Sequence, residues 1–356
     1  MKYYSKELYV NKNARMTAGE KARDDVDSIL EMAGYKDLPV YYPEENKSKN
    51  VFVKLINQFR IFNSLRTSCA PLKNGDMYVV QFPLKQSSFL YPFLIRRLRA
   101  KGVRYITLIH DLETLRSGRL KSTGILRKIK MKIVEISVLK TASKIIVHND
   151  KMLETLAAVG VDKKKMVPIG LFDYLLPGFD PSQRRDKTEK TKPVIIAGNL
   201  RPKKVGYAYN LPTNCDFNLY GVDYGGRLHG SSKYFGAFPS DQIPYVMEGS
   251  FGLVWDGRLA ETCSDMYGDY LRINCPHKTS LYLVSGIPVA IWSHAAQADF
   301  VRKNKVGIVV DSLYDLRGAI NRVSDEEYAQ MRENAERISE KLRDGWYTRE
   351  ALRRCE

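Results

Sequence analysis

The sequence predicts an α/β protein made of two domains, each with a parallel sheet. Short apolar segments that suit strands alternate with amphipathic segments along most of the 356 residues, and this alternation is typical of βα units. The length exceeds what one ordinary core accommodates. Residues 177–193 are charged, flanked by proline and without periodicity, which indicates a linker between the domains.

In the first half, the apolar pattern predicts a short strand and then an amphipathic helix that starts at Gly19 and ends at Gly34. Further elements are expected in the order helix, strand, helix, strand, strand and helix, at residues 51–66, 76–82, 89–100, 103–109, 143–148 and 152–159. All of the expected strands are largely apolar, as strands covered on both faces should be.

Polar residues follow directly after the expected strand at residues 103–109. They are His110 and Asp111, and ligands of open α/β sheets bind beyond the carboxyl ends of the strands. A carboxylate and an imidazole there are candidates for acid–base chemistry. A strand-end turn capped by an aspartate explains the same residues equally well at this stage.

Positive charge is concentrated in the first half. Residues 1–190 contain 36 Lys+Arg and 20 Asp+Glu, a balance of +16, whereas the remainder contains 21 and 20, a balance of +1. Nucleic acid and an anionic membrane are the partners that such a balance suggests. The cations are dispersed and match no nucleic-acid-binding module, so we do not expect nucleic acid. A basic amphipathic helix at residues 117–140 suits an anionic bilayer, although a packed helix with a solvated basic face fits equally well.

The second half opens with an expected strand at residues 194–197, followed by the sequence GNLRPKK. A strand that leads into a glycine and a basic loop suits a phosphate group. Further strands are expected at residues 217–220, 251–255, 287–292 and 306–310, with helices at 295–303 and 325–342 and a short basic piece at the C-terminal end.

The segment at residues 270–292 is the most informative part of this half. Pro276 suits the first turn of a helix, Gly286 suits a left-handed cap at its end, and an apolar strand follows. The helix therefore starts among polar residues that include Lys278, where free N–H groups and the helix dipole favour an anion such as a diphosphate. A capped helix with a solvated lysine is the plainer alternative.

Taken together in this order, the motifs resemble a known family. GLVWDG at residues 252–257, YLRINCPHKTSLYLVSGIPVAIW at 270–292 and AQADFVRKNKVGIVV at 296–310 are similar to segments of the bacterial glucosyltransferase 3-like family, as are NARMTAGEKARDDV, HDLETLR, HNDKM and AGNLRPKK. That family is similar to beta-1,6-galactofuranosyltransferases. The resemblance covers nearly the whole chain and implies the GT-B architecture, in which two Rossmann-like domains face each other across a cleft.

The resemblance also implies which residues bind a UDP-sugar donor. We expect donor contacts from Thr17, Gly19, Asn199, Arg201, Lys204, Tyr234, Asp256, Asn274, Cys275, Pro276, His277, Lys278 and Thr279. Arg201 and Lys278 would neutralise the diphosphate and the charge on departing UDP. On the acceptor side, Asp111 is the first candidate for the general base and His110 the second.

One departure from related retaining enzymes bears on the mechanism. Many of those enzymes carry two glutamates ahead of a GxPV turn, and the corresponding positions here are Ile273 and Leu281. Neither side chain can act as an acid or hold a ribose hydroxyl, so we expect an inverting reaction. No DxD signature is present, and we expect neither a metal nor another cofactor.

The predicted organisation is an acceptor-side domain at residues 1–180, a UDP-sugar-binding domain at 190–335 and a C-terminal helix at 336–356 that returns toward the first domain. The acceptor is expected to be a glycan, a glycoprotein or a lipid-linked molecule. Five scattered cysteines favour a reducing cytoplasm, with peripheral contact at the inner face of the membrane, and we expect a homo-oligomer. A non-catalytic partner subunit of a glycosyltransferase complex is the alternative.

Overall fold

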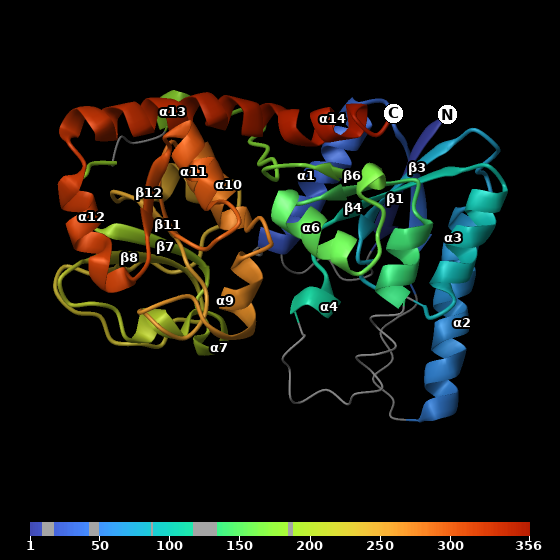
Figure 1. Ribbon diagram of the computed structural model, residues 1–356, viewed down its shortest axis with the longest axis horizontal. Helices are drawn as coiled ribbons and strands as arrows, with labels where there is room; N and C mark the ends of the chain where they lie inside the picture. The colour runs from blue at the N-terminus through green and yellow to red at the C-terminus, as the bar shows by residue number, and fades with distance from the viewer. Residues whose placement is uncertain (9–17, 43–49, 87, 117–133, 184–187) are drawn as a thin grey trace. The chain divides into compact units, whose positions relative to one another are not determined.

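The computed structural model describes residues 1–8, 18–42, 50–86, 88–116, 134–183 and 188–356 (Figure 1). The chain forms two compact units. The first comprises Met1–Asn13, Val26–Ile169 and Arg349–Glu356, and the second comprises Ala14–Asp25 and Gly170–Thr348. The division near residue 170 precedes the expected linker, and the last residues of the chain belong to the first unit.

A parallel sheet of six strands forms the centre of the first unit, in the order β2-β1-β3-β4-β5-β6. The strands are β1 (Lys2–Leu8), β2 (Lys36–Tyr41), β3 (Met77–Phe82), β4 (Arg104–Ile109), β5 (Lys144–Val147) and β6 (Met166–Pro168). The strand order reverses at β1, because β2 lies on one side of it and all later strands on the other. Ligands of open α/β sheets bind at such a switch point, beyond the carboxyl ends of the strands.

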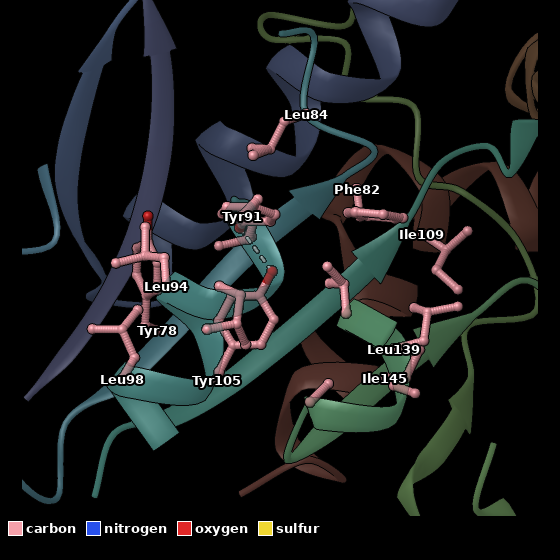
Figure 2. Close-up of a cluster of buried hydrophobic side chains, with 14 of the residues drawn as sticks. Tyr78, Phe82, Leu84, Tyr91, Leu94, Leu98, Tyr105, Ile109, Leu139 and Ile145 are labelled. Carbon is pink, nitrogen blue, oxygen red and sulfur yellow. Dashed lines mark hydrogen bonds between the residues drawn. The ribbon is translucent and has the colours of Figure 1, made fainter. Parts of the chain in front are cut away.

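Helices connect these strands and cover the sheet. They are α1 (Ala18–Met32), α2 (Val51–Ser68), α3 (Tyr91–Ala100), α4 (Glu113–Arg116) and α6 (Asp150–Ala158), and residues 134–141 are also helical. Figure 2 shows the core between β3, β4 and α3, where Tyr78, Tyr91 and Tyr105 pack among leucines and isoleucines. The hydroxyl groups of Tyr91 and Tyr105 lie 2.9 Å apart, so each polar atom is hydrogen-bonded inside the apolar core.

The second unit has the strand order of dinucleotide-binding domains. Its six parallel strands lie in the order β12-β11-β10-β7-β8-β9, which is 3-2-1-4-5-6 when read from β9 with β7 as the first strand. The strands are β7 (Val194–Asn199), β8 (Phe217–Val222), β9 (Lys233–Tyr234), β10 (Gly252–Val254), β11 (Val289–Trp292) and β12 (Gly307–Val310). The switch point of this sheet therefore lies between β7 and β10.

The helices of the second unit are α7 (Pro202–Val205), α8 (Ile243–Val246), α9 (Asp265–Leu271), α10 (His277–Val284), α11 (Ala298–Asn304), α12 (Leu316–Arg322) and α13 (Asp325–Asp344). The last helix, α14 (Trp346–Arg353), begins in the second unit and ends in the first. α13 starts with a capping box, in which Ser324 and Glu327 each bond the other's backbone N–H, and it ends at Gly345 with a φ of 73°.

Helix α10 packs directly against the switch point. The Tyr282 hydroxyl accepts a hydrogen bond from the Ala197 N–H at 2.8 Å and lies 3.3 Å from the carbonyl oxygen of Leu253. It thus joins β7 to β10 where the two strands diverge. A Cβ added to Gly252 would lie 2.1 Å from Cγ of Tyr282, so β10 must carry a glycine where the tyrosine ring crosses it.

Most of the longer elements are confirmed within a few residues, and the expected left-handed cap at Gly286 is present with a φ of 66°. Pro276 precedes the helix as its N-cap rather than lying in its first turn. The expected helix at 295–303 begins at Ala298, and the C-terminal basic piece is helix α14. Strands β2, β6 and β9 were not predicted.

Candidate functional site

The carboxyl ends of β7 and β10 in the second unit bring several of the expected donor-binding residues together. β7 ends at Asn199, and its side-chain oxygen accepts the N–H of Arg201 at 3.0 Å. β10 is followed by Trp255 and Asp256. Lys278, from the first turn of α10, lies between these two strand ends.

The ammonium group of Lys278 is buried. Its Nζ lies 2.9 Å from the carbonyl oxygen of Trp255 and 2.7 Å from Oδ1 of Asp256, and Lys278 is 9% exposed. A Cβ added to Gly198 at the end of β7 would lie 3.9 Å from Lys278 Cε. Burial lowers the pKa of Lys278, the Asp256 carboxylate raises it and the nearby Lys204 lowers it further.

Helix α10 presents its N-terminal end at the same edge. Pro276 caps it with a φ of −69° and a ψ of 133°, so the first helical N–H groups are those of His277 and Lys278, which a helix leaves without an intrahelical partner. The imidazole of His277 stacks on Tyr174 with the ring centroids 5.0 Å apart, and its Nε2 lies 3.3 Å from the carbonyl oxygen of Asp173. Burial lowers the pKa of His277 to about 4. The imidazole is therefore neutral near pH 7 and adds no positive charge.

Two expected donor ligands point into the core instead. The Thr279 hydroxyl donates to Oε1 of Gln297 at 2.7 Å, and Nε2 of Gln297 lies 2.7 Å from Sγ of Cys275. Burial raises the pKa of Cys275 to about 12. These side chains hold the start of α10 in place, so Thr279 and Cys275 can offer an anion only backbone groups. Asn274 leads into this segment, and its N–H bonds the carbonyl oxygen of Tyr270 at 3.0 Å.

Arg201 is an exposed cation at this edge, with 65% of its side chain accessible. Its Nε donates to Oδ2 of Asp223 at 2.7 Å. Asp223 follows β8 with a φ of 63°, and it was not predicted although it ends a strand beside β7. Lys204 supplies its carbonyl to the N–H of Gly257 at 2.9 Å.

Tyr234 lies on β9, next to the end of β8. Its hydroxyl donates to the carbonyl oxygen of Gly221 at 2.8 Å. The centroids of the Tyr234 and Tyr224 rings lie 5.4 Å apart. Gly221 must be a glycine, because its φ is 154° and an added Cβ would lie 1.8 Å from the carbonyl oxygen of Gly198. The hydrogen bond to Gly221 brings the Tyr234 hydroxyl close to the carboxyl end of β8, the strand that Asp223 follows.

In the first unit, a chain of polar side chains lies at the carboxyl edge of the sheet. His110 Nε2 lies 2.5 Å from Oε1 of Gln81, and Nε2 of Gln81 donates to Oδ1 of Asp27 at 2.6 Å. The backbone N–H of His110 also continues the pairing of β3 with β4 by donating to the carbonyl oxygen of Phe82 at 2.7 Å. Gln81 and Asp27 thus orient the imidazole that follows β4, and neither residue was predicted.

Asp111 is accompanied by a second histidine. His148, directly after β5, is buried, and its Nε2 donates to the carbonyl oxygen of Ile109 at 3.1 Å. Burial lowers the pKa of His148 to about 4, against the nearby Asp111 carboxylate, which raises it. His148 is consequently neutral near pH 7 and does not neutralise Asp111. His148 directly follows a strand, as His110 does, so its place in the sequence was a signal for this edge that was missed.

Two other expectations concern α1 and metal binding. Gly19 lies in the first turn of α1, and Thr17 lies outside the described residues. Over the part of the chain that the structure describes, no group of three His, Cys, Asp or Glu side chains is arranged to hold a metal ion.

Two parallel α/β units of this kind occur in the GT-B class of glycosyltransferases. Solved GT-B structures match the entire fold. WaaG, a glycosyltransferase involved in lipopolysaccharide biosynthesis, has a TM-score of 0.60 and 11% identity over 99% of this chain and 98% of its own. HepE of Anabaena in complex with UDP-glucose has a TM-score of 0.55 and 10% identity over 99% and 98%. The predicted fold class is confirmed.

The chain belongs to the glucosyltransferase 3-like family. Its residues 2–171 match the N-terminal domain of that family and residues 194–355 match the C-terminal domain. Beta-1,6-galactofuranosyltransferase WbbI of Escherichia coli K12 is 34% identical over 95% of this chain and 94% of its own length. Glucosyltransferase 3 of Streptococcus gordonii is 23% identical over 93% and 92%. The protein is a glycosyltransferase, and no observation favours a non-catalytic subunit.

Proposed function

We propose that this glycosyltransferase transfers a hexose, glucose or galactofuranose, from a UDP-sugar to a glycan, a glycoprotein or a lipid-linked acceptor. The observation that carries the proposal is the edge of the second sheet, where Lys278, the start of α10 and the exposed Arg201 gather at the switch point. A diphosphate suits such a site, because helix N–H groups and cations both favour anions. The names of the relatives support a hexose, and the UDP-glucose complex of HepE supports the nucleotide.

The proposed reaction is a single displacement with inversion. The acceptor hydroxyl gives its proton to the Asp111 carboxylate, and its oxygen bonds to the anomeric carbon. The bond from that carbon to UDP breaks, and the negative charge passes to the diphosphate. Arg201 and the start of α10 would stabilise that charge, which is why we propose that no metal or other cofactor is needed. The word "beta" in the name of the relative from E. coli supports inversion of an α-linked donor.

The proposal also places the enzyme in the cytoplasm as a homo-oligomer with peripheral contact at the inner face of the membrane. Five buried free thiols, at Cys69, Cys215, Cys263, Cys275 and Cys355, support a reducing compartment. No helix in the described ranges is long and apolar enough to cross a membrane. The expected membrane helix at residues 117–140 falls largely outside the described residues, because 117–133 are not among them.

A panel of UDP-sugars tests the proposal. The enzyme is incubated with each donor, with and without a crude glycan and lipid extract, and UDP release is measured. We expect release from UDP-glucose or UDP-galactofuranose that rises with the extract. An Arg201→Ala variant serves as the control for contaminating hydrolases. Equal release by the variant, or no release from any UDP-sugar, would contradict the proposal.

A further inference from the structure

The first half of α2 carries an apolar stripe on its solvent side. Phe52, Leu55, Ile56 and Phe59 follow the spacing of a single helix face, and they are 77%, 44%, 53% and 52% exposed. The residues of α2 that enter the core, such as Ile61, lie further along the helix. This exposed face therefore contributes nothing to the core of the first unit.

The stripe continues onto the start of α3, with Phe89 just before the helix and Phe93 in its first turn. Phe89 and Phe93 are 51% and 61% exposed, and the rings of Phe59 and Phe89 meet edge to face with their centroids 6.4 Å apart. The N–H of Phe89 donates to Oε1 of Gln58 at 3.1 Å, so the two segments are fixed against each other. We call these six residues the apolar patch: Phe52, Leu55, Ile56, Phe59, Phe89 and Phe93. Single exposed apolar residues are ordinary, whereas a group held together in this way marks an interaction surface.

The apolar patch lies at the same edge of the sheet as the candidate base. α2 follows β2 and α3 follows β3 (Figure 1), so both helices begin at the carboxyl edge of the parallel sheet. His110 and Asp111 follow β4 at that edge. The apolar patch thus borders the part of the first unit to which an acceptor would come.

The segment of the chain that carries the apolar patch has an excess of positive charge. Residues 46–110 contain twelve lysines and arginines and one carboxylate, Asp76. Asp76 precedes β3, at the opposite edge, and is bound to the Met1 ammonium at 2.7 Å. Lys54 and Arg60 flank the stripe on α2 and are exposed. Within the described residues, neither of them takes part in an ion pair.

We propose that the apolar patch docks on an anionic phospholipid bilayer. Phenylalanine side chains on a basic helix insert between lipid headgroups, and the cations bind the phosphates. A second copy of this chain is a poorer occupant, because its own patch would bring the same excess of lysine and arginine. Docking would favour the lipid-linked acceptor among those proposed above. That acceptor rests on the proposed function, whereas the docking itself does not.

Flotation of the full-length protein with vesicles tests this surface. One set of vesicles contains equal parts of phosphatidylcholine and phosphatidylglycerol, and the other contains phosphatidylcholine alone. We expect the protein to float with the anionic vesicles at low salt and to lose this binding at high salt, where charges are screened. Phe52→Ser/Phe59→Ser and Lys54→Glu/Arg60→Glu should each weaken binding by about tenfold or more.

The control pair is Leu259→Ser/Tyr314→Ser, which removes two apolar residues of the second unit that are 48% and 51% exposed. It should float as the wild type does, and circular dichroism should show all variants folded. UDP release from a soluble assay separates the two proposals, since patch variants should keep it even when they no longer float. The docking would be overturned by a wild type that does not float with anionic vesicles, or by patch variants that still float. It would also be overturned if light scattering showed that the patch variants dissociate an oligomer while their vesicle binding is unchanged.

Discussion

The buried ion pair at the switch point changes how Lys278 should be understood. The sequence predicts an ammonium that faces the donor, but in the structure Asp256 already neutralises it at 2.7 Å. Removing one member of a buried pair leaves the other charge without compensation, which commonly costs about 3–5 kcal/mol. The lysine therefore supports the fold of this edge in addition to any role toward a diphosphate.

A pair of variants separates these roles. We expect Lys278→Met to lower the free energy of unfolding by about 3–5 kcal/mol, and Lys278→Met/Asp256→Leu to recover most of that loss, because no buried charge is left. Neither variant should bind UDP as the wild type does. Urea unfolding gives the stabilities and calorimetry the affinities. Normal UDP affinity in the stable double variant would remove Lys278 from the donor site.

The residues after β4 allow a test of the general base. Asp111→Asn keeps the shape of the side chain but removes its basicity, so we expect kcat to fall about 10²–10⁴-fold with UDP affinity nearly unchanged. His110→Gln is the matched variant for the second candidate, and it should have the smaller effect. The product anomer, read by NMR, should be inverted relative to an α-linked donor. Retention of configuration, or turnover by Asp111→Asn near that of the wild type, would leave Asp111 as a strand-end cap.

Among the elements, α10 shows why local sequence indicates a helix but not its surroundings. A proline, a glycine and an apolar strand after them are sufficient to place its ends. The residues of its first turn are polar, yet residues 278–284 are all buried. The Thr279 hydroxyl donates to Gln297, and the Ser280 hydroxyl donates to the carbonyl oxygen of Phe172 at 2.6 Å, so these polar groups are satisfied inside the protein. Those partners are distant in sequence, so spacing alone could not assign Thr279 to the core.

The contact between α10 and β10 makes its own prediction. Gly252→Ala places a methyl group against the buried Tyr282 ring, and overpacking of this kind costs ~1–3 kcal/mol. Gly225→Ala is the control, since an added Cβ there meets nothing within 4 Å. Thermal unfolding should show a lower Tm for Gly252→Ala alone, together with weaker UDP binding. An unchanged Tm would show that the sheet adjusts at this point.

Across the whole molecule, the sequence was sufficient to predict two parallel α/β halves because long apolar strands and periodic helices recur in order. Three strands escaped detection. β9 has two residues and β6 has three, too few for any period to show, whereas β2 has six residues but contains a lysine, an aspartate and a proline, which strands disfavour. In the site, His110 and Asp111 were predicted from their place after a strand, whereas His148 and Gln81 were not predicted. Only the sheet order, which places β3, β4 and β5 side by side, shows that these residues share one edge.

Buried neutral histidines make stability depend on pH, and His148 in the first unit provides the clearest case. Its folded pKa of about 4 lies below the ordinary value of about 6.5. As the pH falls, the unfolded chain therefore binds a proton before the folded protein does. The stability that neutral His148 contributes is fully present above pH 6.5 and is lost as the pH falls toward the folded pKa of about 4. Burial raises the pKa values of Glu135 and Asp25, and both groups act in the opposite direction. The pH dependence of the wild type's free energy of unfolding therefore does not isolate the histidine.

A comparison with His148→Gln isolates it, because glutamine keeps an N–H donor for the carbonyl of Ile109 and does not titrate. We expect the wild type to lose about 3 kcal/mol relative to the variant between about pH 7 and pH 4, as the shift of its pKa requires. Urea midpoints across this range measure the difference. The difference in stability between the wild type and His148→Gln should start to change near the ordinary histidine pKa and should depend little on pH above it. A constant difference would mean that His148 has the same pKa in the folded and unfolded protein, and a change in the opposite direction would mean that the folded protein holds it as a cation.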